Sequence, residues 1–166
     1  RQTGSLIDRR ANRIPSEESE GLIDKLNEIE IPGSKISVYP GKDYRFVLVI
    51  SGEGFESKLM DTDPVPPSKN PSPVVAMNDS SQSTADALNM FLDKSKMILS
   101  DQTAANMILM RGFSKRPHWP SINEIFKFKS AAIAAYPMYR GLSKLIGMDI
   151  LDGGGTFGQE LDTLEK

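Results

Sequence analysis

The stretch "KISVYPGKDYRFVLVISGEG", residues 35–54, decides the fold because it reads as two strands joined by one tight turn. Pro40 and Gly41 mark the turn, and apolar side chains occupy both flanking segments. From Phe46 to Ile50 the second segment is continuously apolar, which is typical of a central strand covered on at least one face. The neighbouring segments must supply that cover.

Amphipathic helices are predicted on both sides of this hairpin. Leucine and isoleucine recur at helical spacing over residues 17–28, with Ser16 as the expected N-cap. A second periodic run extends to Leu99, and Ser83 with Asp86 is expected to cap it.

The order of the elements indicates an α+β fold. Short strands are predicted at residues 5–8 and 105–112, which gives the order strand, helix, strand, strand, helix, strand. That order is the ferredoxin-like split βαβ plan. Residues 129–157 add a C-terminal strand, helix and strand, with a flexible exit. We therefore expect a two-layer α/β sandwich.

Composition narrows the class of protein. The 166 residues are 39% apolar and 25% charged, and the net charge of -2 gives no long-range attraction to nucleic acid or to an anionic membrane. No apolar run is long enough to span a bilayer. Because cysteine is absent, disulfides and thiolate chemistry are excluded, and a cytoplasmic location is expected. A start at Arg1 suggests one domain, residues 1–166, excised from a longer protein.

The motif "DTDP" places Asp61 and Asp63 at the start of a long proline-rich loop, residues 61–80. Loops of this length are functional or disordered. The two carboxylates suit a hard cation, though calcium needs six or more oxygens. They suit equally the binding of substrate hydroxyls, the orientation of an arginine, or a plain Asx-turn before proline.

Arginines gather in two places. "DRRANR" supplies Arg9, Arg10 and Arg13, and Arg111 follows the predicted buried strand at residues 105–112. A guanidinium group grips phosphate or carboxylate through two parallel hydrogen bonds. A solvated basic face and an edge arginine paired with a carboxylate are the plainer alternatives. The lone histidine, His118, lies in a predicted surface turn.

Four stretches taken together resemble a known family. They are "DRRANRIPSEE", "YRFVLVISGEGFESKLMDTDP", "ANMILMRG" and "KSAAIAAYPMYRGLSKLIGMDI". In this order they are similar to the archaeal-type cofactor-independent (2,3-bisphosphoglycerate-independent) phosphoglycerate mutase, over nearly the whole chain from Ser5 to Asp152.

The resemblance implies the inserted substrate-binding domain of a two-domain glycolytic and gluconeogenic isomerase. The larger domain, of the alkaline-phosphatase-like superfamily, carries the serine nucleophile and divalent metal ions (Mn, Mg, Zn or Co). The inserted domain holds phosphoglycerate while the phosphoryl group moves between its hydroxyls. This chain has no such serine context or metal motif, so we expect no metal site and no catalysis by the chain alone.

The same resemblance assigns the site. Arg9, Arg10, Arg13 and Arg111 would neutralise the phosphate and carboxylate of phosphoglycerate, with Arg45 joining them and Lys129 as a weaker candidate. Asp61 and Asp63 would bind hydroxyls or orient those arginines.

The chain departs from the family pattern at several positions. Tyr44 replaces a histidine, Ser51 an arginine, Asn12 a glycine, and Phe113-Ser114 an Ala-Gly pair. Such departures fit weaker phosphoglycerate binding or a relative acting on another phospho-substrate. A ligand-sensing regulatory module with dimerisation through a sheet edge is the alternative from a different class.

Overall fold

The chain divides into two units, Arg1–Lys115 and Arg116–Lys166, in a computed structural model that describes residues 5–63 and 70–164. Helices and small sheets occur in both units, so the predicted α+β class is confirmed. The expectation that residues 1–166 form one inserted domain stays a prediction. Prolines 64, 66 and 67 of the predicted loop lie outside the described residues.

The predicted hairpin forms the larger of the two sheets described in the first unit. Strand β1 (Ser34–Pro40) pairs antiparallel with β2 (Phe46–Gly52), and Val38 lies opposite Leu48. Among the described residues β2 pairs with β1 alone, so its expected central position is wrong. Leu48 packs against the core, whereas Val47 and Val49 are exposed.

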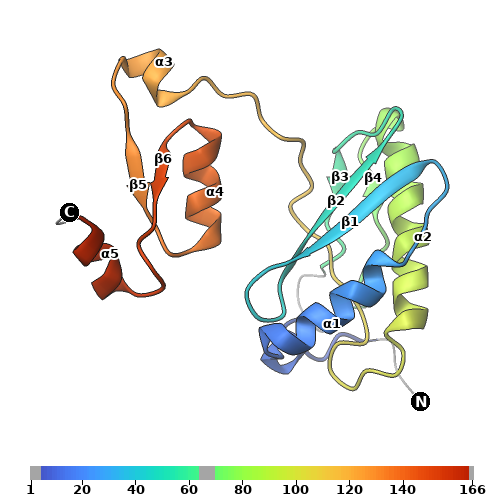
Figure 1. The fold of residues 1–166 in the computed structure, drawn as a ribbon. Helices are drawn as coiled ribbons and strands as arrows, with labels where there is room; N and C mark the ends of the chain where they lie inside the picture. The colour runs from blue at the N-terminus through green and yellow to red at the C-terminus, as the bar shows by residue number, and fades with distance from the viewer. Residues whose placement is uncertain (1–4, 64–69, 165–166) are drawn as a thin grey trace. The chain divides into compact units, whose positions relative to one another are not determined.

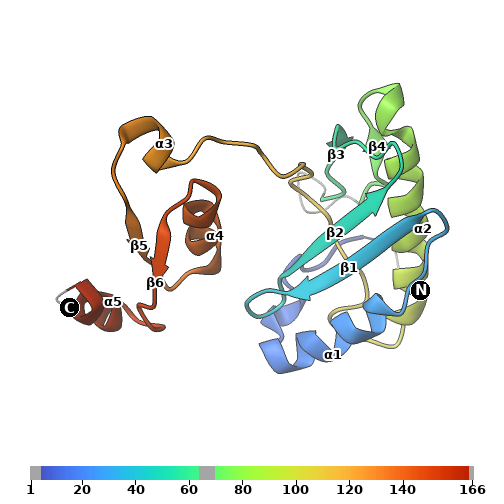
Figure 2. The same ribbon diagram turned by 45° about the horizontal axis from the view of Figure 1, so that its top comes forward.

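Helices α1 (Ser16–Asn27) and α2 (Gln82–Ile98) cover one face of the hairpin, as Figure 1 and Figure 2 show. This confirms the two-layer arrangement for this unit. Apolar residues at helical spacing on both helices fill the space beneath the sheet. The most deeply buried of the core are Leu88, Phe91, Ala85, Leu99, Leu26, Val38 and Val74.

The expected caps of both helices are wrong. The Ser16 hydroxyl accepts a hydrogen bond from the Asp43 N–H (3.1 Å) and so anchors the hairpin turn instead of its own helix. The second helix is preceded by a 3-10 turn, η2 (Asp79–Ser81), whose N-cap is Asn78. Both helices nevertheless begin close to the predicted positions.

Two predicted strands are not strands. Residues 5–8 and 105–112 form no ladder, although Ala105, Ile108 and Met110 are buried as a strand would bury them. Two short strands form elsewhere, β3 (Leu59–Met60) and β4 (Val75–Ala76), and they pair antiparallel.

Two helix asparagines complete the backbone hydrogen bonding that the short strands leave open. Asn27 donates to the Val38 carbonyl (2.9 Å) and accepts from the Val38 N–H (2.7 Å). Asn89 makes the same two bonds with Val74, both 2.9 Å. Each primary amide therefore replaces a neighbouring strand at one residue.

The second unit contains the predicted strand, helix and strand. Strands β5 (Ala131–Ile133) and β6 (Asp149–Leu151) are parallel and are joined through helix α4 (Pro137–Leu145). The unit also has helix α3 (Ile122–Phe126), which begins with a capping box at Ser121. Residues 152–156, the expected flexible exit, form neither helix nor strand, and a helix that was not predicted, α5 (Phe157–Leu164), follows them.

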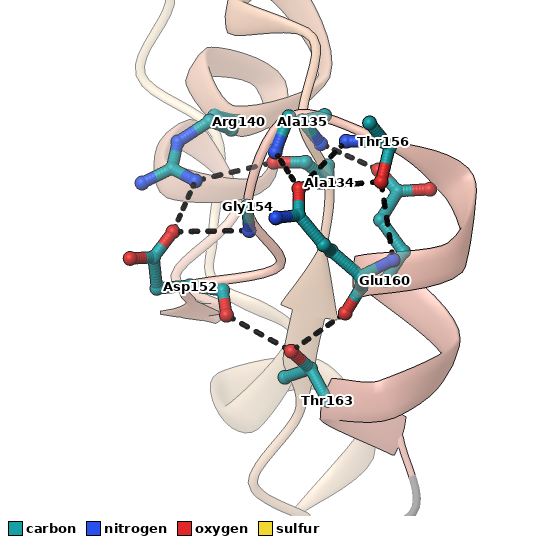
Figure 3. A network of polar contacts seen from close by, with 10 residues as sticks. Ala134, Ala135, Arg140, Asp152, Gly154, Thr156, Glu160 and Thr163 are labelled. Carbon is teal, nitrogen blue, oxygen red and sulfur yellow. Dashed lines mark hydrogen bonds and ion pairs between the residues drawn. The ribbon is translucent and has the colours of Figure 1, made fainter.

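A polar network links the segments that follow β5 and β6 (Figure 3). Glu160 accepts a hydrogen bond from the Ala135 N–H (2.6 Å), and Arg140 donates to the Ala134 carbonyl (3.2 Å). Thr163 donates to the Asp152 carbonyl at 3.0 Å. Helix α5 is therefore fixed to the ends of both strands by side chains.

Replacing Asn89 by alanine is expected to lower the free energy of unfolding by about 1–3 kcal/mol, because the buried backbone groups of Val74 lose their partner. Urea unfolding of the chain measures the change. Met90→Ala, at the exposed neighbouring position, is the control and should have little effect. Equal losses in the two variants would contradict the role assigned to Asn89.

Candidate functional site

The centre of the "DTD" motif is fixed to the "MRG" segment by one threonine. Thr62 is 1% exposed, and its N–H donates to the Met110 carbonyl at 2.9 Å. Its hydroxyl donates to the same carbonyl (3.2 Å) and accepts from the Met110 N–H (2.8 Å). Two stretches almost fifty residues apart in sequence are thereby held in one register.

The two aspartates lie on either side of this buried threonine. Asp61 is exposed, whereas the Asp63 side chain is only 12% exposed. The Asp61 carboxylate accepts a hydrogen bond from the Gly112 N–H at 2.9 Å. Gly112 has a φ of +72°, a left-handed conformation that disfavours side chains with a Cβ.

Asp63 brings two distant arginines together. Its side chain is 12% exposed; Oδ1 lies 3.0 Å from an Arg9 guanidinium nitrogen, and Oδ2 lies 3.9 Å from one of Arg111. Oδ1 is buried without a well-aligned hydrogen bond, so the ion pair with Arg9 compensates its burial. The Arg111 side chain is 75% exposed.

Arg9 projects from a turn that Asp8 stabilises. The Asp8 carboxylate accepts hydrogen bonds from the N–H groups of Arg10 (2.9 Å) and Asn12 (2.7 Å). These two bonds, with the nearby charges of Arg10 and Arg13, hold the pKa of Asp8 below its ordinary value. The turn that follows, η1 (Ala11–Arg13), has positive φ at all three residues, which explains why it needs this support.

The remaining predicted residues lie outside the Arg9–Asp63–Arg111 cluster. Arg10 and Arg13 are exposed on the Asp8-stabilised turn. Arg45, in the hairpin turn, pairs with Asp43 (3.7 Å) and stacks on the Tyr44 ring (4.6 Å). Because Asp43 also bonds Ser16, this turn lies beside the start of α1.

Lys129 lies in the second unit, immediately before β5. The proposed ligand roles of Lys129 and of the other predicted residues stay predictions.

No group of three or more His, Cys, Asp or Glu side chains converges at a metal-binding geometry within residues 5–63 and 70–164. Asp61 and Asp63 are instead engaged with a backbone N–H and with two arginines. The hard-cation interpretation of the "DTDP" motif therefore finds no support in their contacts. In the same ranges, no helix combines the length and apolarity that crossing a membrane requires.

Sequence reasoning missed the structural roles of Thr62 and Asp8. No local pattern marks Thr62, because residues 62 and 63 form a bend and Asp63 beside it is largely buried. For Asp8 the signal was an aspartate followed two residues later by a backbone turn, the arrangement of an Asx-turn.

Comparison with known proteins adds the family. A family model described as 2,3-bisphosphoglycerate-independent phosphoglycerate mutase matches residues 1–105. The chain is 45% identical, over 97% of its length, to a protein from Thermosipho africanus named as a probable 2,3-bisphosphoglycerate-independent phosphoglycerate mutase. A protein of the same name from Thermus thermophilus is 38% identical over 98% of the chain.

A solved structure agrees with these sequence matches. The cofactor-independent phosphoglycerate mutase of Thermoplasma acidophilum is similar, with a TM-score of 0.68 and 28% identity over 91% of this chain. This chain covers 44% of that structure and about 40% of the length of the curated relatives.

The support from Asp8 is expected to depend on pH in one direction. Because the pKa of Asp8 is lowered in the folded chain, its stabilisation is complete above the unfolded value of about 3.9. It is lost as the pH falls through the lower folded value. The amide resonances of Arg10 and Asn12 should therefore titrate together with the Asp8 carboxyl carbon in NMR spectra.

In Asp8→Asn this acidic transition of the two amides should disappear. Amides of Arg10 and Asn12 that do not respond to pH in the unsubstituted chain would contradict the assignment.

Proposed function

The chain belongs to the 2,3-bisphosphoglycerate-independent phosphoglycerate mutase family, and we propose that its first unit binds phosphoglycerate for such an enzyme. The parent would interconvert 3-phosphoglycerate and 2-phosphoglycerate, as a phosphotransferase-type isomerase of cytoplasmic glycolysis and gluconeogenesis. The names of the relatives support this activity. The alternative of a ligand-sensing module has no support among them.

One observation carries the proposal: Asp63 pairs with both Arg9 and Arg111, and the Arg111 side chain remains 75% exposed. Two cations held by one buried carboxylate are arranged before any ligand arrives. Such preorganisation lowers the entropy cost of binding an anion. An arginine that is mostly exposed retains donors for phosphate or carboxylate oxygens.

The roles of the chain's own residues follow from these contacts. Arg111 would bind one anionic group of phosphoglycerate through its exposed guanidinium. Arg9 would contribute positive charge beside it, while Asp63 orients both arginines. Asp61 holds the backbone at Gly112 and so fixes the residue that follows Arg111. Arg10 and Arg13, on the adjoining turn, would add to the positive potential.

Phosphoryl transfer itself would take place in the remainder of the longer protein. Enzymes that transfer phosphoryl groups depend mainly on positioning of the substrate and on charge stabilisation. A substrate-binding unit supplies the positioning. The divalent metal ions that the family resemblance implies would belong to that remainder. We derive no step through them.

The second unit is the proposed contact with this remainder. Parallel strands are normally covered on both faces, yet β5 and β6 form a sheet of two. Its helices expose large apolar side chains. They include Met138, Tyr139 and Leu142 of α4 and Phe157, Leu161 and Leu164 of α5. Relatives that are more than twice as long have the residues to cover them.

Titration of the chain with 3-phosphoglycerate at low salt, followed by amide shifts in NMR spectra, tests the proposed binding. We expect saturable shifts around Asp63, Arg111 and Gly112. Arg111→Ala should weaken the affinity by about tenfold to a hundredfold, the loss of one hydrogen-bonded charge.

Lys96→Ala is the matched control, because it removes an exposed cation that pairs with Asp93 on α2. If both substitutions weaken binding equally, the ligand responds only to net charge, and the proposed site is wrong.

Hydrogen exchange tests the proposed contact of the second unit. In the 166-residue chain, amides of residues 131–133 and 149–151 should exchange much faster than the hydrogen-bonded amides of residues 46–50. Only three residue pairs join β5 to β6, whereas seven join β1 to β2, and Leu48 of β2 packs against the core. In the full-length protein they should become protected. Equal exchange rates in the two proteins would contradict the contact.

A further inference from the structure

We infer that Thr62 is a positioning residue, whose hydroxyl sets the distance between the Asp63 carboxylate and the Arg111 guanidinium in the phosphoglycerate site. This inference rests on the proposed function and names a residue whose side chain does not itself face the ligand. Thr62 is 1% exposed and directed into the core.

The N–H and the hydroxyl of Thr62 both bond Met110 of the opposite segment, while the Thr62 carbonyl accepts a hydrogen bond from the Ser72 N–H at 3.1 Å. The Thr62 N–H and hydroxyl both donate to the Met110 carbonyl, and the hydroxyl accepts from the Met110 N–H. The Thr62 hydroxyl thus takes the place of a backbone carbonyl as the acceptor for the Met110 N–H, and the Thr62 N–H bonds the Met110 carbonyl as in a strand pair. The register between residues 61–63 and residues 110–112 is therefore set at this point.

The functional groups lie one residue from this pair on each segment. Asp63 follows Thr62, and Arg111 follows Met110; the two side chains meet at 3.9 Å. Asp61 precedes Thr62 and bonds the N–H of Gly112. A displacement of Met110 relative to Thr62 is passed directly to Arg111, because adjacent Cα atoms are held at a fixed separation.

The hydroxyl can be removed with little change of shape. Thr62→Val keeps the branched side chain and leaves the Met110 N–H without its acceptor, while Thr62→Ser keeps the hydroxyl. Thr84→Val is a matched control: Thr84 is 3% exposed, and its hydroxyl accepts from the Glu56 N–H at 2.9 Å. It removes an equally buried hydroxyl from another part of the same unit.

The first measurement is made without ligand. NMR resonances of the Gly112 amide and of the Arg111 side-chain Nε report the local register. We expect both to move in Thr62→Val and to keep their positions in Thr62→Ser and Thr84→Val. Unchanged resonances in a folded Thr62→Val chain would overturn the inference, whatever the chain binds.

The second measurement is the dissociation constant of the 166-residue chain for 3-phosphoglycerate. Thr62→Val should weaken it by about tenfold, comparable to losing one charge-assisted contact, and Thr62→Ser should restore it to within about twofold. Thr84→Val should leave it unchanged. If Thr84→Val weakens 3-phosphoglycerate binding as much as Thr62→Val does, Thr62 only stabilises the fold, and the inference is overturned.

The two measurements separate the inference from the proposed function. Absence of any saturable response in the unsubstituted chain contradicts phosphoglycerate binding, and the ligand-free resonances still decide the role of Thr62. If Thr62→Val does not fold, Thr62→Cys takes its place, because a thiol is a weaker donor and acceptor than a hydroxyl. The Gly112 amide and Arg111 Nε resonances of Thr62→Cys should then lie between those of the unsubstituted chain and those expected without a hydrogen bond from residue 62. Resonances equal to those of the unsubstituted chain would overturn the inference.

Discussion

Buried backbone groups that lack a neighbouring strand are the constraint on which the first unit depends. Each sheet of the described residues has only two strands, so many strand edges must find other partners. Asn27, Asn89 and Thr62 supply them from side chains, each satisfying both backbone groups of one residue. The pairings of Asn27 and Asn89 fix helices to the layer of strands. The pairing of Thr62 fixes the two segments of the candidate site to each other. The same kind of interaction, a side chain bonded to the backbone of one residue, therefore contributes to the stability of the fold and to the geometry of the candidate site.

The charges of the site follow from this arrangement. Holding Thr62 inward places Asp63 at the boundary of the core, where an unpaired carboxylate would be costly. Arg9 and Arg111 compensate it, and Arg9 lies two residues before η1, whose three residues have positive φ. Asp8 supports that turn through two backbone N–H groups. Asp63 thus joins three sequence segments through its ion pairs, whereas Asp8 supports the backbone of one of these segments.

The periodicity of apolar residues predicted the helices and strands that have a regular pattern of burial. It failed where side-chain hydrogen bonds take the place of a strand-to-strand ladder. It located α1, α2 and the hairpin, because their apolar faces repeat over several turns or residues. It failed at residues 5–8, where Ile7 is 97% exposed, and at residues 105–112, where Met110 pairs with a side chain instead of a strand. Helix α5 carried a detectable signal, since Phe157, Leu161 and Leu164 are spaced as one helical face. For the candidate site, the sequence and its family resemblance named Arg9, Asp63 and Arg111, but local patterns gave no distance between segments that far apart.

The departures from the family pattern leave this cluster intact. Tyr44 lies in the hairpin turn and stacks on Arg45, and Ser51 is exposed on β2 opposite Lys35. Phe113 packs against the core of the first unit. Asn12 has a φ of 52°, a conformation that asparagine and glycine adopt more readily than other residues, so its exchange with glycine preserves the turn. None of these four side chains contributes to the Arg9–Asp63 or Arg111–Asp63 ion pairs. The Arg9–Asp63–Arg111 cluster is therefore independent of these four departures.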